Sequence, residues 1–219
     1  MTATVTDPTA TEPARPQVIL PPGWVLLPVT ADNAATARET FASGWERGPR
    51  DSIGPFIHRM ESWLTTMLDD AHHSGGTSVV LPLGVPWQVP VSTGIVFSRA
   101  APPAGVLGAS DALPLPDSGD LVETDAGPAR HRVVDHEVPA DADDTSMVRL
   151  HTIERTWVAP EGDAYVLATA TIAGQPIDDY APVADALLLL IETILDAVTW
   201  TTPPPAENPG ERQDNASAR

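Results

Sequence analysis

Proline and glycine interrupt this chain along most of its length, with 24 prolines and 15 glycines among 219 residues. Proline lacks the backbone N–H that helices and central strands need, and glycine weakens both kinds of element. So many interruptions exclude a coiled coil or a bundle of long helices. Hydrophobic residues still make up 42% of the chain, which is enough for a packed core. We therefore expect a folded protein of short elements and many turns.

The charge of the chain restricts its partners. It carries 30 acidic against 12 basic residues, a formal net charge of -18, and every basic residue is arginine. Phosphate groups would be repelled, so neither nucleic acid nor an anionic membrane is expected as the main partner. There is no cysteine, which excludes a disulfide framework, a thiol nucleophile and a thiolate metal site. The absence of lysine and the heavy use of Ala, Pro and Val indicate a GC-rich bacterial coding bias.

The two ends differ in composition from the middle of the chain. Residues 1–16 and 202–219 hold mainly Thr, Pro, Ala, Asn and charged residues, so we expect two disordered tails around one domain over residues 17–201. The first residues contain no apolar run of the signal-peptide type. The most apolar stretch, Leu187–Ile191, is too short to cross a bilayer. We therefore expect a cytoplasmic protein without membrane insertion.

The first half of the domain is expected to be mainly helical after one short strand over Trp24–Val29. Asp32 or Asn33 can cap a helix that continues to Trp45. A second helix is expected from Pro55, a residue favoured in the first turn, to Ala71. The apolar stripe of this second helix is expected to contain Phe56, Met60, Trp63, Met67 and Ala71, widened by Ile57, Leu64 and Leu68.

The second half alternates with a period of two, which is typical of strands. Residues 100–129 are expected to be irregular apart from a short strand near Leu121. A last helix is expected over Asp178–Val198. Short turns join successive strands, which favours antiparallel pairing, and the helices must cover the sheet. The fold class is therefore α+β, an antiparallel sheet covered by helices. The five main strands are expected over Thr77–Leu83, Val91–Ser98, Arg130–Val138, Met147–Val158 and Tyr165–Ala173.

The order of elements, from the Pro22-Gly23-Trp24 opening strand to the last helix, resembles the PsbP/Mog superfold, most clearly over Asp185–Trp200. More narrowly, Pro22–Pro28 and Gly75–Pro82 are similar to uncharacterised actinobacterial proteins loosely associated with type VII secretion neighbourhoods. The resemblance implies a fold and a genomic setting but no catalytic residue. Secreted lipoprotein relatives would need a signal peptide and an acylated cysteine, so that role is not expected here.

One strand is expected to present a basic face. Period two places Arg149, His151 and Arg155 on the same side. If the acidic turn before this strand closes a hairpin, His136 lies near Arg149 while Asp135 points to the opposite face. Such a face could bind a carboxylate or phosphate, or it could be a solvated surface whose charges pair with acids elsewhere.

An acidic segment precedes and includes that turn. Residues 111–144 hold ten acids against two arginines. Asp141, Asp143 and Asp144 lack the glycine and the distal glutamate of a calcium loop. The segment is therefore expected to be a solvated loop or a docking surface for a basic protein partner.

Trp87 is bracketed by Pro86 and Pro90. A large aromatic side chain on a stiff connection loses little entropy on binding, which suits an interface anchor. The same residue could equally fold back onto the core.

Sequence motifs of catalysis and cofactor binding are absent. There is no phosphate loop, no nucleophile elbow and no His-Glu-x-x-His pair. His72 and His73 are neighbours on a helix, so their rings do not converge on a metal. We expect no metal and no cofactor. The first hypothesis is a non-catalytic binding or adaptor protein, an accessory factor of a secretion locus. The alternatives are an enzyme or small-ligand binder that uses Arg149, His151 and Arg155, and a structural subunit of an oligomer.

Overall fold

The computed structural model describes residues 13–45, 50–84, 90–103, 113–139, 141, 146–175, 177 and 181–201. In this part of the chain, a seven-stranded antiparallel sheet and three helices form one α+β domain, as the sequence predicts. The strand order is β2-β3-β4-β8-β7-β6-β5. The sheet strands are β2 Val25–Pro28, β3 Gly76–Leu81, β4 Val91–Ala100, β5 Asp120–Thr124, β6 Gly127–Asp135, β7 Val148–Val158 and β8 Tyr165–Gly174. The helices are α1 Asn33–Trp45, α2 Arg50–His73 and α3 Ala181–Asp196, and a separate two-stranded sheet pairs β1 Pro16–Gln17 with β9 Thr199–Trp200.

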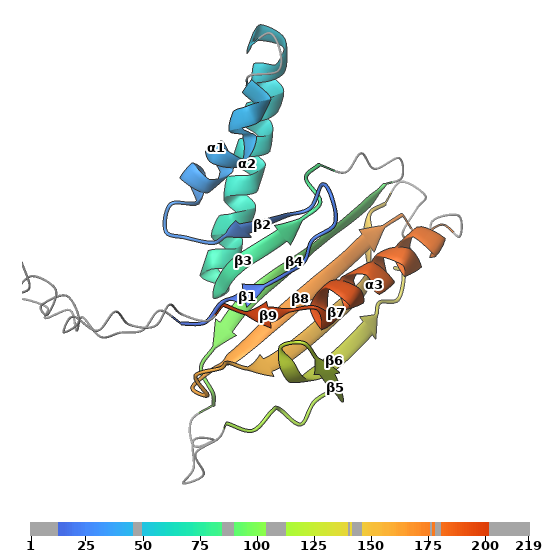
Figure 1. Cartoon of the computed structure of the whole chain (residues 1–219). Coiled ribbons are helices and arrows are strands. Elements are labelled where there is room, and N and C mark those ends of the chain that lie inside the picture. Colours follow the sequence, from blue (N-terminus) through green and yellow to red (C-terminus); the bar gives the residue numbers. More distant parts are fainter. Residues whose placement is uncertain are drawn as a thin grey trace, which may run out of the picture.

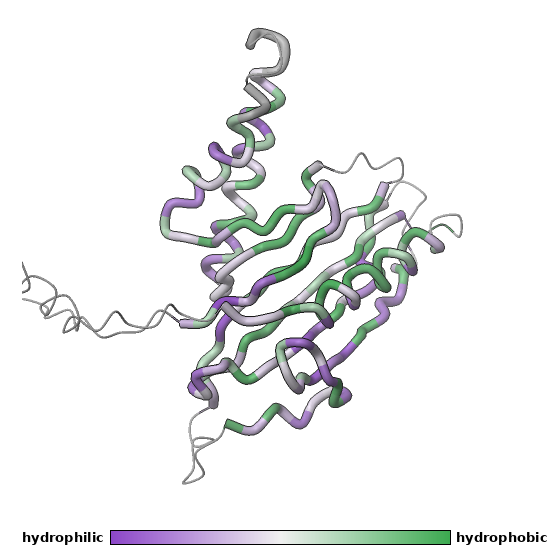
Figure 2. Tube along the Cα trace, viewed as in Figure 1, coloured by the Kyte–Doolittle hydropathy of each residue, from purple (hydrophilic) through white to green (hydrophobic). Residues whose placement is uncertain are grey.

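Helix α3 covers one face of the sheet (Figure 1). Its apolar residues recur every three or four positions, so they share one side of the helix. This side packs on the inward-facing residues of the central strands, including Phe97, Ile153 and Trp157, each 0% exposed. The tube coloured by hydropathy shows the same concentration of apolar residues along α3 (Figure 2). The buried residues of α3 are Ala184, Leu187, Ile191, Ile194 and Leu195.

The α1–α2 pair packs on the opposite face of the sheet. Neighbouring residues of a strand point to opposite faces, and Val80 belongs to the α3 core while Val79 belongs to a second, smaller core under α2. The upper half of α2 projects beyond the sheet together with the end of α1 (Figure 1). Coverage of this face is therefore partial. The smaller core consists of Leu27, Ala37, Leu64, Leu68, Ala71, Val79 and Leu81.

Two expectations for the helices need correction. Helix α2 begins at Arg50, so Pro55 lies inside the helix rather than opening it. Proline this close to the start removes only one helical hydrogen bond, and the following turns continue. The expected apolar stripe is also wrong in part, because Phe56 is 59% exposed and Trp63 is 49% exposed. The core side of α2 is the set that was expected only to widen the stripe: Ile57, Leu64 and Leu68, with Ala71.

The start of α1 follows the expected capping. The Oδ1 atom of Asp32 accepts a hydrogen bond from the backbone N–H of Ala35, which satisfies one free donor of the first turn. Asn33 is buried, and its side-chain amide donates to Asp69 of α2. The cap and this bridge fix the start of α1 against α2.

The described residues before β2 are part of the packed structure. Ala14, Arg15 and Pro16 fall in the expected N-terminal tail, but Ala14 is only 7% exposed and Pro16 pairs with Trp200. Val18 and Leu20 pack against the α3 core. Both ends of the described chain therefore meet on the face that α3 covers.

No helix in the described ranges is long and apolar enough to cross a membrane.

Candidate functional site

An apolar hollow lies in the corner between α2 and the sheet face that α3 does not cover. We call it the corner cavity; its volume is about 370 Å³. Trp63, Met67 and Ala71 supply its helical wall. The rest of its lining comes from β3, β4, β8 and adjacent residues: Val79, Leu81, Pro82, Leu83, Val91, Ser92, Thr93, Gly94, Val96, Thr169, Thr171 and Ala173.

The cavity arises because α2 directs its apolar residues in two directions. Adjacent residues of a helix point about 100° apart. Leu64 and Leu68 point into the smaller core, while Trp63 and Met67 lie on the side that faces the open corner. Met67 also packs against the smaller core, whereas about half of the Trp63 side chain remains exposed.

The floor of the cavity is made of small residues on alternate positions of β4 and β8. Gly94 lies opposite Thr171 and Ser92 lies opposite Ala173, so these side chains share one face of the sheet. A Cβ atom on Gly94 would come within 3.0 Å of Leu81 Cδ2, so a larger residue there would require Leu81 to move. Because these side chains are short, the space above this part of the sheet remains open.

The lining is free of charge. Among the described residues that form the corner cavity there is no Asp, Glu, Lys, Arg or His, although the chain as a whole is strongly charged. Placing an unpaired charge in such an environment is costly. The cavity therefore suits an apolar or neutral group, with the hydroxyls of Ser92, Thr169 and Thr171 as the polar contacts. Thr93 is different, because it lies opposite Ile172 and so faces the α3 core.

A shallower hollow of about 510 Å³ continues along the outer side of α2. It shares Trp63 and Met67 with the corner cavity. Its other residues are polar or charged: Arg59, Ser62, Thr66 and Asp70. The apolar corner thus has a polar border on the solvent side of α2.

The residues expected to contact a protein partner are only partly described. Trp87, Asp143 and Asp144 lie outside the described residues. Asp141 is described and exposed, and it does not line the corner cavity. The described chain stops at Gly84 and resumes at Pro90, next to Leu83 and Val91, which both line the cavity.

The expected basic face is wrong in its geometry. Arg149 pairs with Ala173, whereas His151 pairs with the next residue of β8, Ile172, so Leu150 is an extra residue in β7. Such a β-bulge shifts the alternation by one. Arg149 consequently lies on the face of the cavity floor, while His151 and Arg155 lie on the α3 side.

The register with β6 is also shifted by one residue from the expected one. Asp135, not His136, lies on the same face as His151, and its Oδ1 is 2.8 Å from His151 Nδ1. Arg155 is 3% exposed and donates from Nη1 to Asp196 Oδ1 at 2.7 Å. The three candidate residues therefore do not converge, and two of them already have acidic partners.

Sequence reasoning missed a second polar pair beneath α3. His131 lies directly opposite Arg155, and its Nε2 is 3.3 Å from Glu192 Oε1. Glu192 and Asp196 are one helical turn apart, so two carboxylates of α3 reach two cationic or ionisable groups of the sheet. Arg155 Nε and His131 Nδ1 are buried without a hydrogen-bond partner among the described residues. These contacts attach the end of α3 to β6 and β7.

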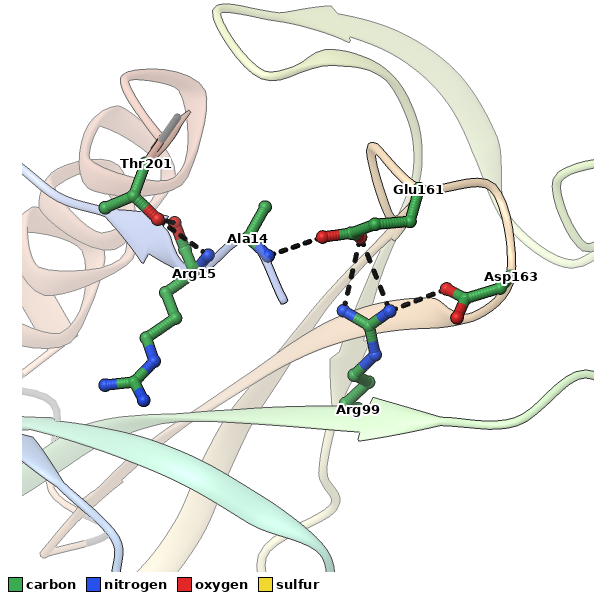
Figure 3. A network of polar contacts seen from close by, with 6 residues as sticks. All are labelled: Ala14, Arg15, Arg99, Glu161, Asp163 and Thr201. Carbon is green, nitrogen blue, oxygen red and sulfur yellow. Dashed lines mark hydrogen bonds and ion pairs between the residues drawn. The ribbon is translucent and has the colours of Figure 1, made fainter. Parts of the chain in front are cut away.

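A third polar network joins the N-terminal segment to the sheet (Figure 3). Arg99 donates to Asp163 at 2.6 Å and contacts Glu161 at 3.4 Å, and Glu161 also accepts the backbone N–H of Ala14. Burial raises the pKa of Glu161, but the hydrogen bonds from the Ala14 and Glu161 backbone and the Arg99 guanidinium outweigh it and lower that pKa below its usual value. The Glu161 carboxylate therefore links the N-terminal segment at Ala14 to Arg99 of β4.

No metal site is evident in the part of the chain that the structure describes, where no three His, Cys, Asp or Glu residues cluster. His72 and His73 are exposed, with ring centroids 6.2 Å apart at an edge-on angle.

Comparison of the chain with protein-family models, curated proteins and solved structures finds no match. What the protein does must therefore be inferred from its own residues.

Proposed function

We propose that the protein is a non-catalytic binding or adaptor protein, and that it receives an apolar part of a protein partner in the corner cavity. One observation carries this proposal: an uncharged, apolar hollow remains open beside the half-exposed Trp63, on a sheet face that the chain itself covers only in part. Exposed apolar patches with a polar border are a common feature of interaction sites and ligand-binding grooves. Tryptophan is also among the residues that contribute most to binding energy at interfaces.

The cellular location, the genomic neighbourhood and the kind of partner that the sequence predicts are part of the same proposal. We propose a PsbP/Mog-like adaptor of actinobacterial origin that acts in the cytoplasm as an accessory factor of a secretion locus. The described antiparallel sheet, with a C-terminal helix that ends before Trp200, is compatible with the fold in this proposal. The partner is proposed to carry a basic surface, because exposed acids such as Glu123, Glu137 and Asp141 would attract it before contact. Asp143, Asp144 and Trp87 are proposed to add steering and anchoring.

The alternative of an enzyme or small-ligand site on β7 has little support. It needs Arg149, His151 and Arg155 to meet, whereas the bulge at Leu150 separates the first from the others.

The test is affinity capture from the organism that carries the gene, with three versions of the full chain as bait. Ala173→Phe fills the floor of the corner cavity, and Ala186→Phe adds the same side chain at an exposed position of α3 as the matched control. The recovered amount of at least one captured protein should be lower by roughly tenfold or more with Ala173→Phe than with the wild type, and unchanged with Ala186→Phe. Equal recovery with all three baits would overturn the proposal, provided that thermal unfolding shows both variants folded.

A further inference from the structure

We infer that the group received beside α2 is the apolar face of an amphipathic helix of the partner. This rests on the proposed function, since it specifies what enters the same corner. We use the name α2 groove for the corner cavity and the adjoining hollow along α2, together with the exposed Phe56, which lines neither hollow but lies in line with Trp63 on the same side of the helix.

The groove has the length and periodicity of a helix-binding surface. Phe56 and Trp63 are seven residues apart, which is nearly two full turns, so they lie in line, and Met67 is one turn further. From Phe56 to Ala71 the helix rises roughly 22 Å at 1.5 Å per residue. A partner helix of about four turns would match this length. Its contact residues would be spaced i, i+4, i+7 and i+11.

A helix fits this groove better than an extended peptide does. The floor is the face of the sheet, where β8 is paired on both sides, with β4 and β7, while β4 is paired with β8 along its whole length and with β3 over Ile95–Ser98. An extended peptide lying on this face would find no backbone partners, because the hydrogen-bonding groups of strands point along the sheet and not out of its face, and buried unpaired backbone groups are costly. A helix satisfies its own backbone and offers only side chains, which can pack beside α2 and onto the small residues of the floor.

A small neutral molecule would explain only part of the surface. It could fill the corner cavity, but Phe56 does not line that cavity and is 59% exposed. A partner helix that lies along α2 covers Phe56, Trp63 and Met67 together, which accounts for the whole apolar line.

Charges at the border of the groove give the partner helix an orientation. Arg59 and Asp70 lie on the same side of α2 as Trp63, about 16 Å apart along its axis at 1.5 Å per residue. Neither side chain forms an ion pair with another described residue. The complementary helix therefore carries an acidic residue near Arg59 and a basic residue near Asp70, with its apolar face between them.

The experiment uses a displayed library of 16-residue peptides against the full chain. Half of the library has apolar residues at positions 2, 6, 9 and 13, and the other half has the same composition in random order. Counter-selection against Trp63→Ser removes peptides that bind elsewhere. Leu189→Ser is the matched control, because Leu189 is an exposed apolar residue of α3.

We expect the Trp63-dependent binders to come from the patterned half. The best peptide should become helical on binding and lose affinity by about 30-fold or more on Trp63→Ser, but not on Leu189→Ser. Arg59→Glu should weaken peptides with an acidic residue at the matching end by roughly threefold and favour those with a basic one.

Three results would overturn the inference: equal enrichment of both halves, no Trp63-dependent binder, or self-association of the full chain that Trp63→Ser abolishes in sedimentation. Capture of a host protein that depends on Ala173 but contacts the groove through a non-helical segment would leave the proposed function standing while this inference fails.

Discussion

The two faces of the sheet are covered to different degrees. On one face, α3, the terminal segments and the central strands enclose the larger core, and Ile191, Leu195 and Trp157 are completely buried. On the other face, α2 encloses a smaller core with Leu64 and Leu68 and leaves Trp63 and Phe56 half exposed. Most of the buried apolar area therefore lies on the α3 side, whereas the α2 side leaves apolar side chains exposed. Under the proposed function, these exposed side chains are the ones that contact a partner.

The largest expected effect tests whether the α3 face dominates stability. Ile191→Ala should lower the free energy of unfolding by about 4 kcal/mol, because the enclosed core cannot collapse onto the space left behind. Leu68→Ala, equally buried but next to the open corner, should cost about 2–3 kcal/mol. Urea unfolding of the two variants measures the difference. Equal losses would show that the two faces contribute alike.

The second effect concerns the attachment of α3. Asp196→Ala leaves the buried Arg155 without its carboxylate partner and should cost about 2 kcal/mol, less than for a fully buried pair because Asp196 itself is largely exposed. Adding Arg155→Met should recover much of this loss, since no unpaired charge then remains. A double-mutant cycle compares the thermal unfolding of the wild type, Asp196→Ala, Arg155→Met and the double variant. A double variant as unstable as Asp196→Ala would show that the ion pair is not the cause.

A smaller effect is expected on the open face. Trp63→Ser should change the free energy of unfolding by less than about 0.5–1 kcal/mol, because half of this side chain already faces solvent. Its effect should instead be seen in binding. A loss of several kcal/mol in the same unfolding assay would place Trp63 in the core and remove the basis of the groove.

The smallest effect is a pH dependence of stability at Glu161, which accepts the backbone N–H of Ala14. The pKa of Glu161 is lowered in the folded protein from its usual value of 4.5. Its contribution to stability is therefore complete above pH 4.5 and is lost as the pH falls through the folded-state pKa. The difference in melting temperature between the wild type and Glu161→Gln should shrink between pH 5 and pH 3. A difference that stays constant over this range would contradict the assignment.

The order and kind of most elements follow from local patterns. Period-two alternation locates β4, β7 and β8 within a few residues, and the spacing of Leu187, Ile191 and Ile194 locates the buried side of α3. These signals are strong because each element has one face buried and the other not. The short turn between β7 and β8 also favours the antiparallel pairing that the structure shows.

The candidate site was harder to predict from the sequence, because a shift of one residue in a strand or helix changes which side chains reach it. The extra residue Leu150 moves Arg149 to the other face, and a bulge has no distinct composition. In α2, Trp63 and Leu64 are both apolar neighbours, and only the tertiary position of α1 and β3 decides which one is buried. The one available signal was that α2 has more apolar residues than one core-facing side can hold.

The pairing of β1 with β9 determines how the domain responds to tension. Pro16 lies opposite Trp200 and Gln17 lies opposite Thr199, so the chain leaves both strands at the same end of the pair. Force applied to the two ends would act on the contact between Arg15 and Thr201 first and then separate the strands one residue pair at a time, as a zip opens. Peeling of this kind needs less force than sliding two strands past each other. In a domain tethered at both ends, β1 and β9 would therefore separate before the strands of the central sheet do.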